Sequence, residues 1–235
     1  MKKIFCFLFF VFCCLLLSEA QTMVLEVDRS QDLIPAKRGP NLKTFGCLFL
    51  GGGLVASGDQ AGARIKYGSS GEYFVGGRAK YKISGLYSLG WEFQAHFQYY
   101  KLQQTAGKIL PDTNQHNVER FDIGSIGLSF YNRFNFDPHR GNYLGNFLDL
   151  GITGEWMYSF IHVTKDKAPD NTDIKISQTN LPYINNLASD VFVRVGFNKI
   201  SIYARYRISD FFKTQYGYPE LPKLIAGVEF AIFRD

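Results

Sequence analysis

Four histidines are the side chains of this sequence that first suggest chemistry: His96, His116, His139 and His162. No two of them are three or four residues apart, and none has a cysteine nearby, so the usual spacing of a transition-metal site is missing. Nucleophilic catalysis needs a base, an orienting group and a nucleophile within hydrogen-bond reach. The one set that the sequence offers is His96 with Glu92 and Ser129. Because the spacing of a metal site is missing, we expect no metal ion and no cofactor. We also expect no enzymatic activity, because the one candidate set points inward in a barrel, whereas lipid chemistry needs access from the bilayer.

A glycine-rich segment has the spacing of a dinucleotide-binding loop. Gly51, Gly53 and Ala56 occupy the positions of that fingerprint, and Glu72 follows at a suitable distance. The fingerprint binds pyrophosphate only when a helix begins directly after the glycines. Here the chain continues as SGDQAGARIKYGSSG, which is typical of a loop. Tight packing within a strand explains these glycines better.

The polar residues between 89 and 100, in LGWEFQAHFQYY, alternate with apolar ones. Glu92, Gln94 and His96 fall on one side, and aromatic residues such as Trp91 and Phe93 fall on the other. A period of two indicates a β-strand, because successive side chains point to opposite faces. A soluble sandwich buries the aromatic face. A membrane barrel turns that face to lipid and lines its interior with the polar one.

The N-terminus is typical of an exported protein. Lys2 and Lys3 precede an apolar run from Ile4 to Leu17, and the small residues Ser18 and Ala20 follow it. This is the plan of a signal peptide, and the run is short for a spanning helix. We assign 1–20 to a cleaved signal peptide, 21–43 to a periplasmic lead-in and 44–235 to one outer-membrane β-barrel domain.

Cysteine usage and charge narrow the class of protein further. Only Cys47 remains after the signal peptide is removed, so no intramolecular disulfide can form. No later segment contains an apolar run close to the about 18 residues that a membrane-spanning helix needs. An exported chain without a helical span belongs to the periplasm, the exterior or, as a barrel, the outer membrane. The net charge of +5 is spread along the chain, so we expect no nucleic-acid partner.

Eight strands and no convincing helix are predicted after residue 43, with approximate bounds 44–56, 71–83, 86–101, 119–134, 146–163, 188–197, 200–209 and 224–233. The odd-numbered connections are long and polar: 57–70, 102–118, 164–187 and 210–223. Two even-numbered connections are tight turns, an alternation typical of small outer-membrane barrels. We predict an all-β fold, an eight-stranded antiparallel transmembrane β-barrel with an up-and-down meander.

The polar faces of these strands combine charges with glycines. The interior of an eight-stranded barrel has little room beyond its own side chains, so the polar face is predicted to be the inside. Charges in a narrow interior are costly unless they are paired, and we predict a salt-bridge network that plugs the barrel. Its predicted members are Arg78, Lys80, Glu92, Asp149, Glu155, Arg194, Arg205, Arg207 and Glu229.

Aromatic residues gather in the connection 210–223: Phe211, Phe212, Tyr216 and Tyr218. They allow two interpretations. Exposed aromatics on a rigid scaffold suggest a partner surface. An aromatic girdle at the membrane interface is the simpler alternative.

One segment carries a family resemblance through Tyr131, Asn132, Arg133, Arg140, Gly141, Asn142, Asp149, Gly151 and Trp156. This segment, YNRFNFDPHRGNYLGNFLDLGITGEW, resembles the uncharacterised outer-membrane β-barrel proteins of Bacteroidetes, a PorT-like group. The closing YARYRISDFFKTQYGYPELPKLIAGVEFAIF is similar to the last hairpin of that group. The resemblance implies an outer-membrane barrel and no assigned reaction. One relative is tied to a secretion machinery.

We therefore expect a non-enzymatic outer-membrane protein with a plugged polar lumen. Its role would be structural or interactive, through external loops or an envelope assembly. Expected partners are outer-membrane lipid, the barrel-assembly machinery during biogenesis and an envelope or secretion complex. A small porin-like channel and a lipid-modifying barrel enzyme are the alternatives.

Overall fold

The structure, a computed structural model, describes residues 39–57, 60–139, 141–179 and 181–233. The predicted signal peptide and most of the lead-in lie outside the described residues. Two single-turn 3-10 helices, η1 (Tyr67–Ser69) and η2 (Thr214–Tyr216), interrupt an otherwise all-β fold. Among the described residues, no helix has the length and apolar character that a membrane span requires.

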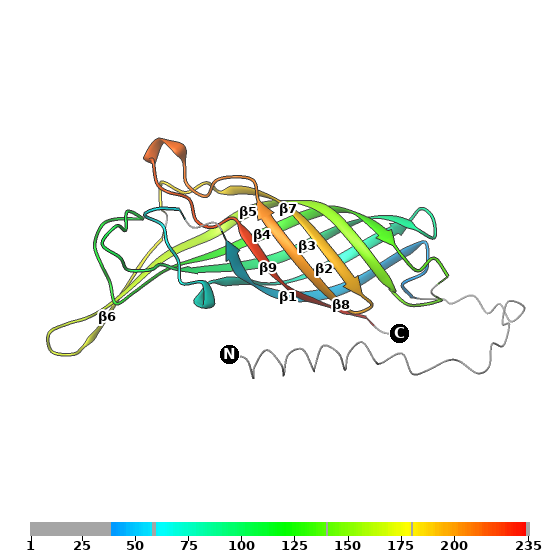
Figure 1. The fold of residues 1–235 in the computed structure, drawn as a ribbon, viewed down its shortest axis with the longest axis horizontal. Coiled ribbons are helices and arrows are strands. Elements are labelled where there is room, and N and C mark those ends of the chain that lie inside the picture. The colour runs from blue at the N-terminus through cyan, green and yellow to red at the C-terminus, as the bar shows by residue number, and fades with distance from the viewer. Residues whose placement is uncertain (1–38, 58–59, 140, 180, 234–235) are drawn as a thin grey trace, which may run out of the picture. The chain divides into compact units, whose positions relative to one another are not determined.

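Eight antiparallel strands close into a barrel (Figure 1). They are β1 (Thr44–Ser57), β2 (Gly71–Lys82), β3 (Tyr87–Lys101), β4 (Val118–Asn135), β5 (Asn146–Lys167), β7 (Leu187–Phe197), β8 (Ile200–Arg207) and β9 (Leu224–Ile232). Successive strands pair along the barrel, and β1 pairs with β9 to close it. The predicted eight-stranded up-and-down meander is confirmed.

A further strand, β6 (Asp173–Gln178), lies outside the closed barrel. It pairs with the end of β5 from His162 to Lys167, and this hairpin extends beyond the other strands (Figure 1). The prediction of a loop over 164–187 is therefore wrong for its first half. All six residues of β6 are exposed, so the segment has no buried face that sequence alternation could reveal.

The alternation of side chains places the polar face inside. On β3, Glu92, Gln94 and His96 are buried, whereas Trp91 and Phe93 are half exposed. The other strands repeat this arrangement and carry exposed apolar side chains around the barrel, among them Leu50, Val75, Leu128, Ile152, Val193, Ile202 and Val228. We call these the outer apolar band. On β4 the band ends near the long connections, where Arg120 pairs with Asp122 on the outer face.

Glycines in the interior make room for aromatic rings from neighbouring strands. The ring of Phe147 lies so close to Gly196 that any β-carbon there would overlap it, and Tyr131 covers Gly90 in the same way. The interior is therefore filled by side chains, as the narrow radius of an eight-stranded barrel requires.

The end of the barrel that carries the long connections, which we call the mouth, is closed by an apolar core. Phe211 and Phe212 are only 1% and 2% exposed. Their rings pack with Tyr100, Phe121 and Phe160 from β3, β4 and β5. For these two residues, both the girdle and the partner-surface interpretation are wrong. They fold inward because the interior of the barrel near the mouth is apolar, and burial there removes both rings from solvent.

Candidate functional site

Three arginines and three carboxylates form a network inside the barrel, and we call it the inner network. Its members are Arg78, Arg133, Arg194, Glu92, Asp149 and Glu229. Arg194 on β7 is central, because it lies 2.8 Å from Asp149 and 2.8 Å from Glu229 and also contacts Glu92. The formal charges balance and every member is buried. This pairing is the condition under which a confined interior tolerates ions.

The two other arginines hold the same carboxylates from different strands. Arg133 on β4 donates through two nitrogens to the two oxygens of Asp149, at 2.7 and 2.8 Å. Arg78 on β2 bridges Glu92 and Glu229. Bidentate arginine–carboxylate pairs are strong and directional. The inner network therefore links six strands of the barrel: β2, β3, β4, β5, β7 and β9. The sequence had singled out Arg133 only as part of the family-like segment.

A second charged group lies closer to the mouth and is centred on His96. The two ring nitrogens of His96 lie 2.7 Å from Glu72 and 2.8 Å from Glu155. Arg205 contacts the same Glu155 oxygen at 2.8 Å and lies 3.9 Å from Asp190. Both imidazole nitrogens donate only when the ring carries two protons, so this geometry suits His96 as a cation between two carboxylates.

The structure does not assemble the catalytic set that the sequence offered. Glu92 belongs to the inner network, whereas His96 contacts other carboxylates. Ser129 shares a hydrogen bond of 2.9 Å with Thr153. These three residues are therefore parts of three separate interactions.

The glycine-rich motif is part of the sheet. Gly51 and Gly53 lie within β1, and Glu72 on β2 is paired directly opposite Gly53. Because β1 continues to Ser57, Gly51, Gly53 and Ala56 are strand residues and do not form the turn before a helix that pyrophosphate binding requires.

The nine residues predicted to share one network are distributed over several places. Arg207 lies at the mouth, where it pairs with Glu220 at 3.2 Å and its guanidinium stacks 3.3 Å from the ring of Phe211. Lys80 is buried, with its ammonium 6.0 Å from the ring of Phe45. Glu155 and Arg205 belong to the second group. The inner network contains the remaining five: Arg78, Glu92, Asp149, Arg194 and Glu229.

The family-like residues divide between the two faces of the sheet. Four face the interior: Tyr131, Arg133, Asp149 and Gly151. Asn132, which accepts a hydrogen bond of 2.6 Å from Tyr87, and Trp156 face outward. In the turn between β4 and β5, Gly141 has a φ of +53°, which favours glycine, and Asn142 lies beside Gly39. Arg140 lies outside the described residues.

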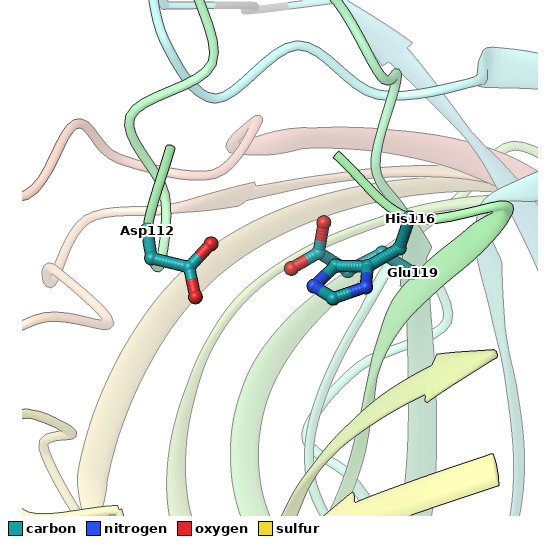
Figure 2. Close-up of side chains that lie close together, drawn as sticks. All are labelled: Asp112, His116 and Glu119. Carbon is teal, nitrogen blue, oxygen red and sulfur yellow. The ribbon is translucent and has the colours of Figure 1, made fainter. Parts of the chain in front are cut away.

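A third polar cluster lies at the mouth, on the connection before β4 and at the start of that strand. Figure 2 shows Asp112, His116 and Glu119 turned toward one another, and one potential ligand atom of each lies within 4.8 Å of the other two. The Lys108 ammonium donates to Glu119 and lies 3.6 Å from Asp112. We call these four residues the mouth cluster. The cluster has no paired histidines or cysteines, the pattern by which metal sites are usually found in a sequence. The sequence does place one carboxylate four residues before His116 and another three residues after it.

Glu119 is the buried anchor of the mouth cluster. It accepts hydrogen bonds from Lys108, from Gln104 at 2.8 Å and from His162 at 2.8 Å. Burial opposes ionisation of this carboxyl group, but the hydrogen bonds from His162, Lys108 and Gln104 outweigh burial and hold the pKa of Glu119 below its usual value. The cluster therefore contains an ionised carboxylate that is already oriented.

Comparison with known proteins assigns no family to this chain. No family model matches it. A search of curated proteins finds no match either. The functional conclusion therefore rests on the geometry of the barrel and on the sequence.

Proposed function

We propose that this protein is an outer-membrane β-barrel with a plugged lumen, whose role is structural or interactive. The observation that supports it most directly is the inverted distribution of polarity. The inner network is buried, while large apolar side chains such as Phe93, 53% exposed, form the outer apolar band. An apolar surface of this extent around a whole barrel is a liability in water and is what contact with lipid requires.

Aromatic side chains at both borders of the outer apolar band support a bilayer orientation. Tyr73 and Tyr158 lie toward the mouth, and Tyr81, Phe134 and Phe197 lie toward the short turns. Aromatic girdles at the two interfaces are a general feature of membrane barrels. In this orientation the mouth and the β5–β6 hairpin face the exterior and present the surface available to a partner.

The sequence supports the same proposal. The N-terminal segment has the plan of an export signal, and the C-terminal half resembles PorT-like barrels. We propose that the chain belongs to that group. Its partners are then membrane lipid, the barrel-assembly machinery and, through the mouth, an envelope or secretion complex.

The location is tested by fractionation. We expect the mature protein in the outer-membrane fraction, and we expect faster gel migration before boiling than after it, because a folded barrel resists detergent. A soluble periplasmic protein serves as the fractionation control. Recovery of the mature protein with that control would overturn the proposal.

The plugged lumen is tested by conductance. The inner network and the apolar core at the mouth occupy the interior in succession, so we expect no steady current when the purified protein is inserted into planar bilayers. A known open porin in the same bilayers is the positive control. Steady unitary conductance would favour the channel alternative, and altered lipid A in a deletion strain would favour the enzyme.

A further inference from the structure

The mouth cluster combines the side chains that bind divalent transition metals. Asp112, His116 and Glu119 supply two carboxylates and one imidazole, and their candidate ligand atoms lie within 4.8 Å of one another. Zinc binds such ligands at about 2.0–2.2 Å, so a small inward movement brings all three to one ion. Asp112 is the most exposed of the three, and it can make this movement without disturbing a strand.

The ring of His116 is oriented by a second carboxylate. Its Nδ1 lies 2.6 Å from an oxygen of Asp166 on β5. A carboxylate on one imidazole nitrogen fixes the tautomer and presents the other nitrogen to a metal, a common arrangement outside the ligands of zinc sites. Glu119 is oriented in a comparable way, because His162 holds its other oxygen at 2.8 Å.

A positive charge already lies between the two carboxylates of the cluster. The Lys108 ammonium contacts Glu119 and is 3.6 Å from Asp112, and the side chain is buried. Lysine is a compact charge on a flexible stem, so it can leave such a position without a change of backbone. The cluster is thus built around a cation, and Lys108 supplies one in this structure.

We propose that the mouth cluster is a binding site for a divalent transition-metal ion of the zinc type, which displaces the ammonium of Lys108. The imidazole selects against calcium and magnesium, which prefer all-oxygen ligands. The bound ion joins the connection before β4 to the strand itself and, through Asp166, to β5. This inference concerns the folded barrel and does not depend on the cellular role proposed above.

The proposal gives opposite expectations for two neighbouring substitutions. His116→Ala removes a ligand, and we expect zinc affinity to fall by about tenfold or more. Lys108→Met keeps the stem but removes the competing charge, and we expect zinc affinity to rise by about tenfold. If the cluster has a purely structural role, both substitutions leave zinc affinity unchanged.

The test is calorimetric titration of the full mature protein, without a histidine tag, with zinc chloride in detergent. His139→Ala is the matched control, because His139 is exposed in the turn between β4 and β5 at the opposite end of the barrel. Asp112→Asn is the second ligand variant, since the Asp112 side chain is 49% exposed and asparagine keeps its size. Heat-modifiable gel mobility reports that each variant is folded.

We expect one zinc ion per wild-type chain, weaker binding by both ligand variants and unchanged binding by His139→Ala. Failure of the folded wild-type protein to bind zinc at millimolar concentration would overturn the proposal, even if Lys108→Met binds, because Lys108 would then be the permanent cation. Equal binding by His116→Ala and His139→Ala would overturn it as well.

Discussion

Replacing Arg194 with methionine is expected to lower the free energy of unfolding by about 3–5 kcal/mol, the usual cost of breaking a buried ion pair. Arg194 contacts Glu92, Asp149 and Glu229. Without Arg194, the inner network has three buried carboxylates and only two arginines, Arg78 and Arg133. Methionine keeps much of the volume, so the loss reports the charge and not a cavity.

Urea unfolding in lipid vesicles measures this effect. The matched control is Arg120→Met, because Arg120 is also a strand arginine paired with a carboxylate, Asp122, at 3.0 Å. Its side chain is 44% exposed on the outer face, and an exposed pair contributes about 0–1 kcal/mol. Equal losses for the two variants would show that the inner network has no special role in stability.

Replacing Phe93 with arginine is expected to cost about 2–4 kcal/mol in lipid vesicles, the penalty for a cation near the middle of a bilayer. Phe93 lies midway along the outward face of β3, between Trp91 and Phe97, and its side chain is half exposed. Phe93→Leu should cost far less, because leucine keeps an apolar contact with lipid. If the band faces water, arginine is tolerated at this position.

The control for this substitution is Ile174→Arg. Ile174 is also an exposed apolar strand residue, but it lies on β6, outside the closed barrel. We expect little change in the free energy of unfolding, because the hairpin is beyond the bilayer in the proposed orientation. Equal effects at residues 93 and 174 would contradict that orientation.

The strands were predictable because a period of two is a local property of the sequence. The predicted second strand, 71–83, differs from β2 (Gly71–Lys82) by a single residue. The inward position of Glu92 and the outward position of Phe93 follow from the same alternation. The lengths of the segments between these strands also separated the short turns from the long connections.

The partners inside the lumen were not predictable, because they depend on the stagger of strands around the barrel. Arg78 meets Glu229 across 151 residues of sequence, and Arg194 meets Glu92 across 102 residues. A shift in register opposite Gly124 adds to the difficulty, since it reverses the alternation on β5 before Phe160. The burial of Phe211 and Phe212 likewise depends on rings from β3, β4 and β5, which are distant in sequence.

The pairing of β1 with β9 has a consequence for the order of assembly. Every other pairing in the closed barrel joins strands that follow one another, so it can form while later residues are still arriving. The last strand also carries Glu229, the carboxylate that balances the third arginine of the inner network. A chain that ends before Leu224 therefore has two unpaired edges and an uncompensated positive charge inside. Closure of the barrel and charge balance in the inner network therefore both depend on the same strand, β9.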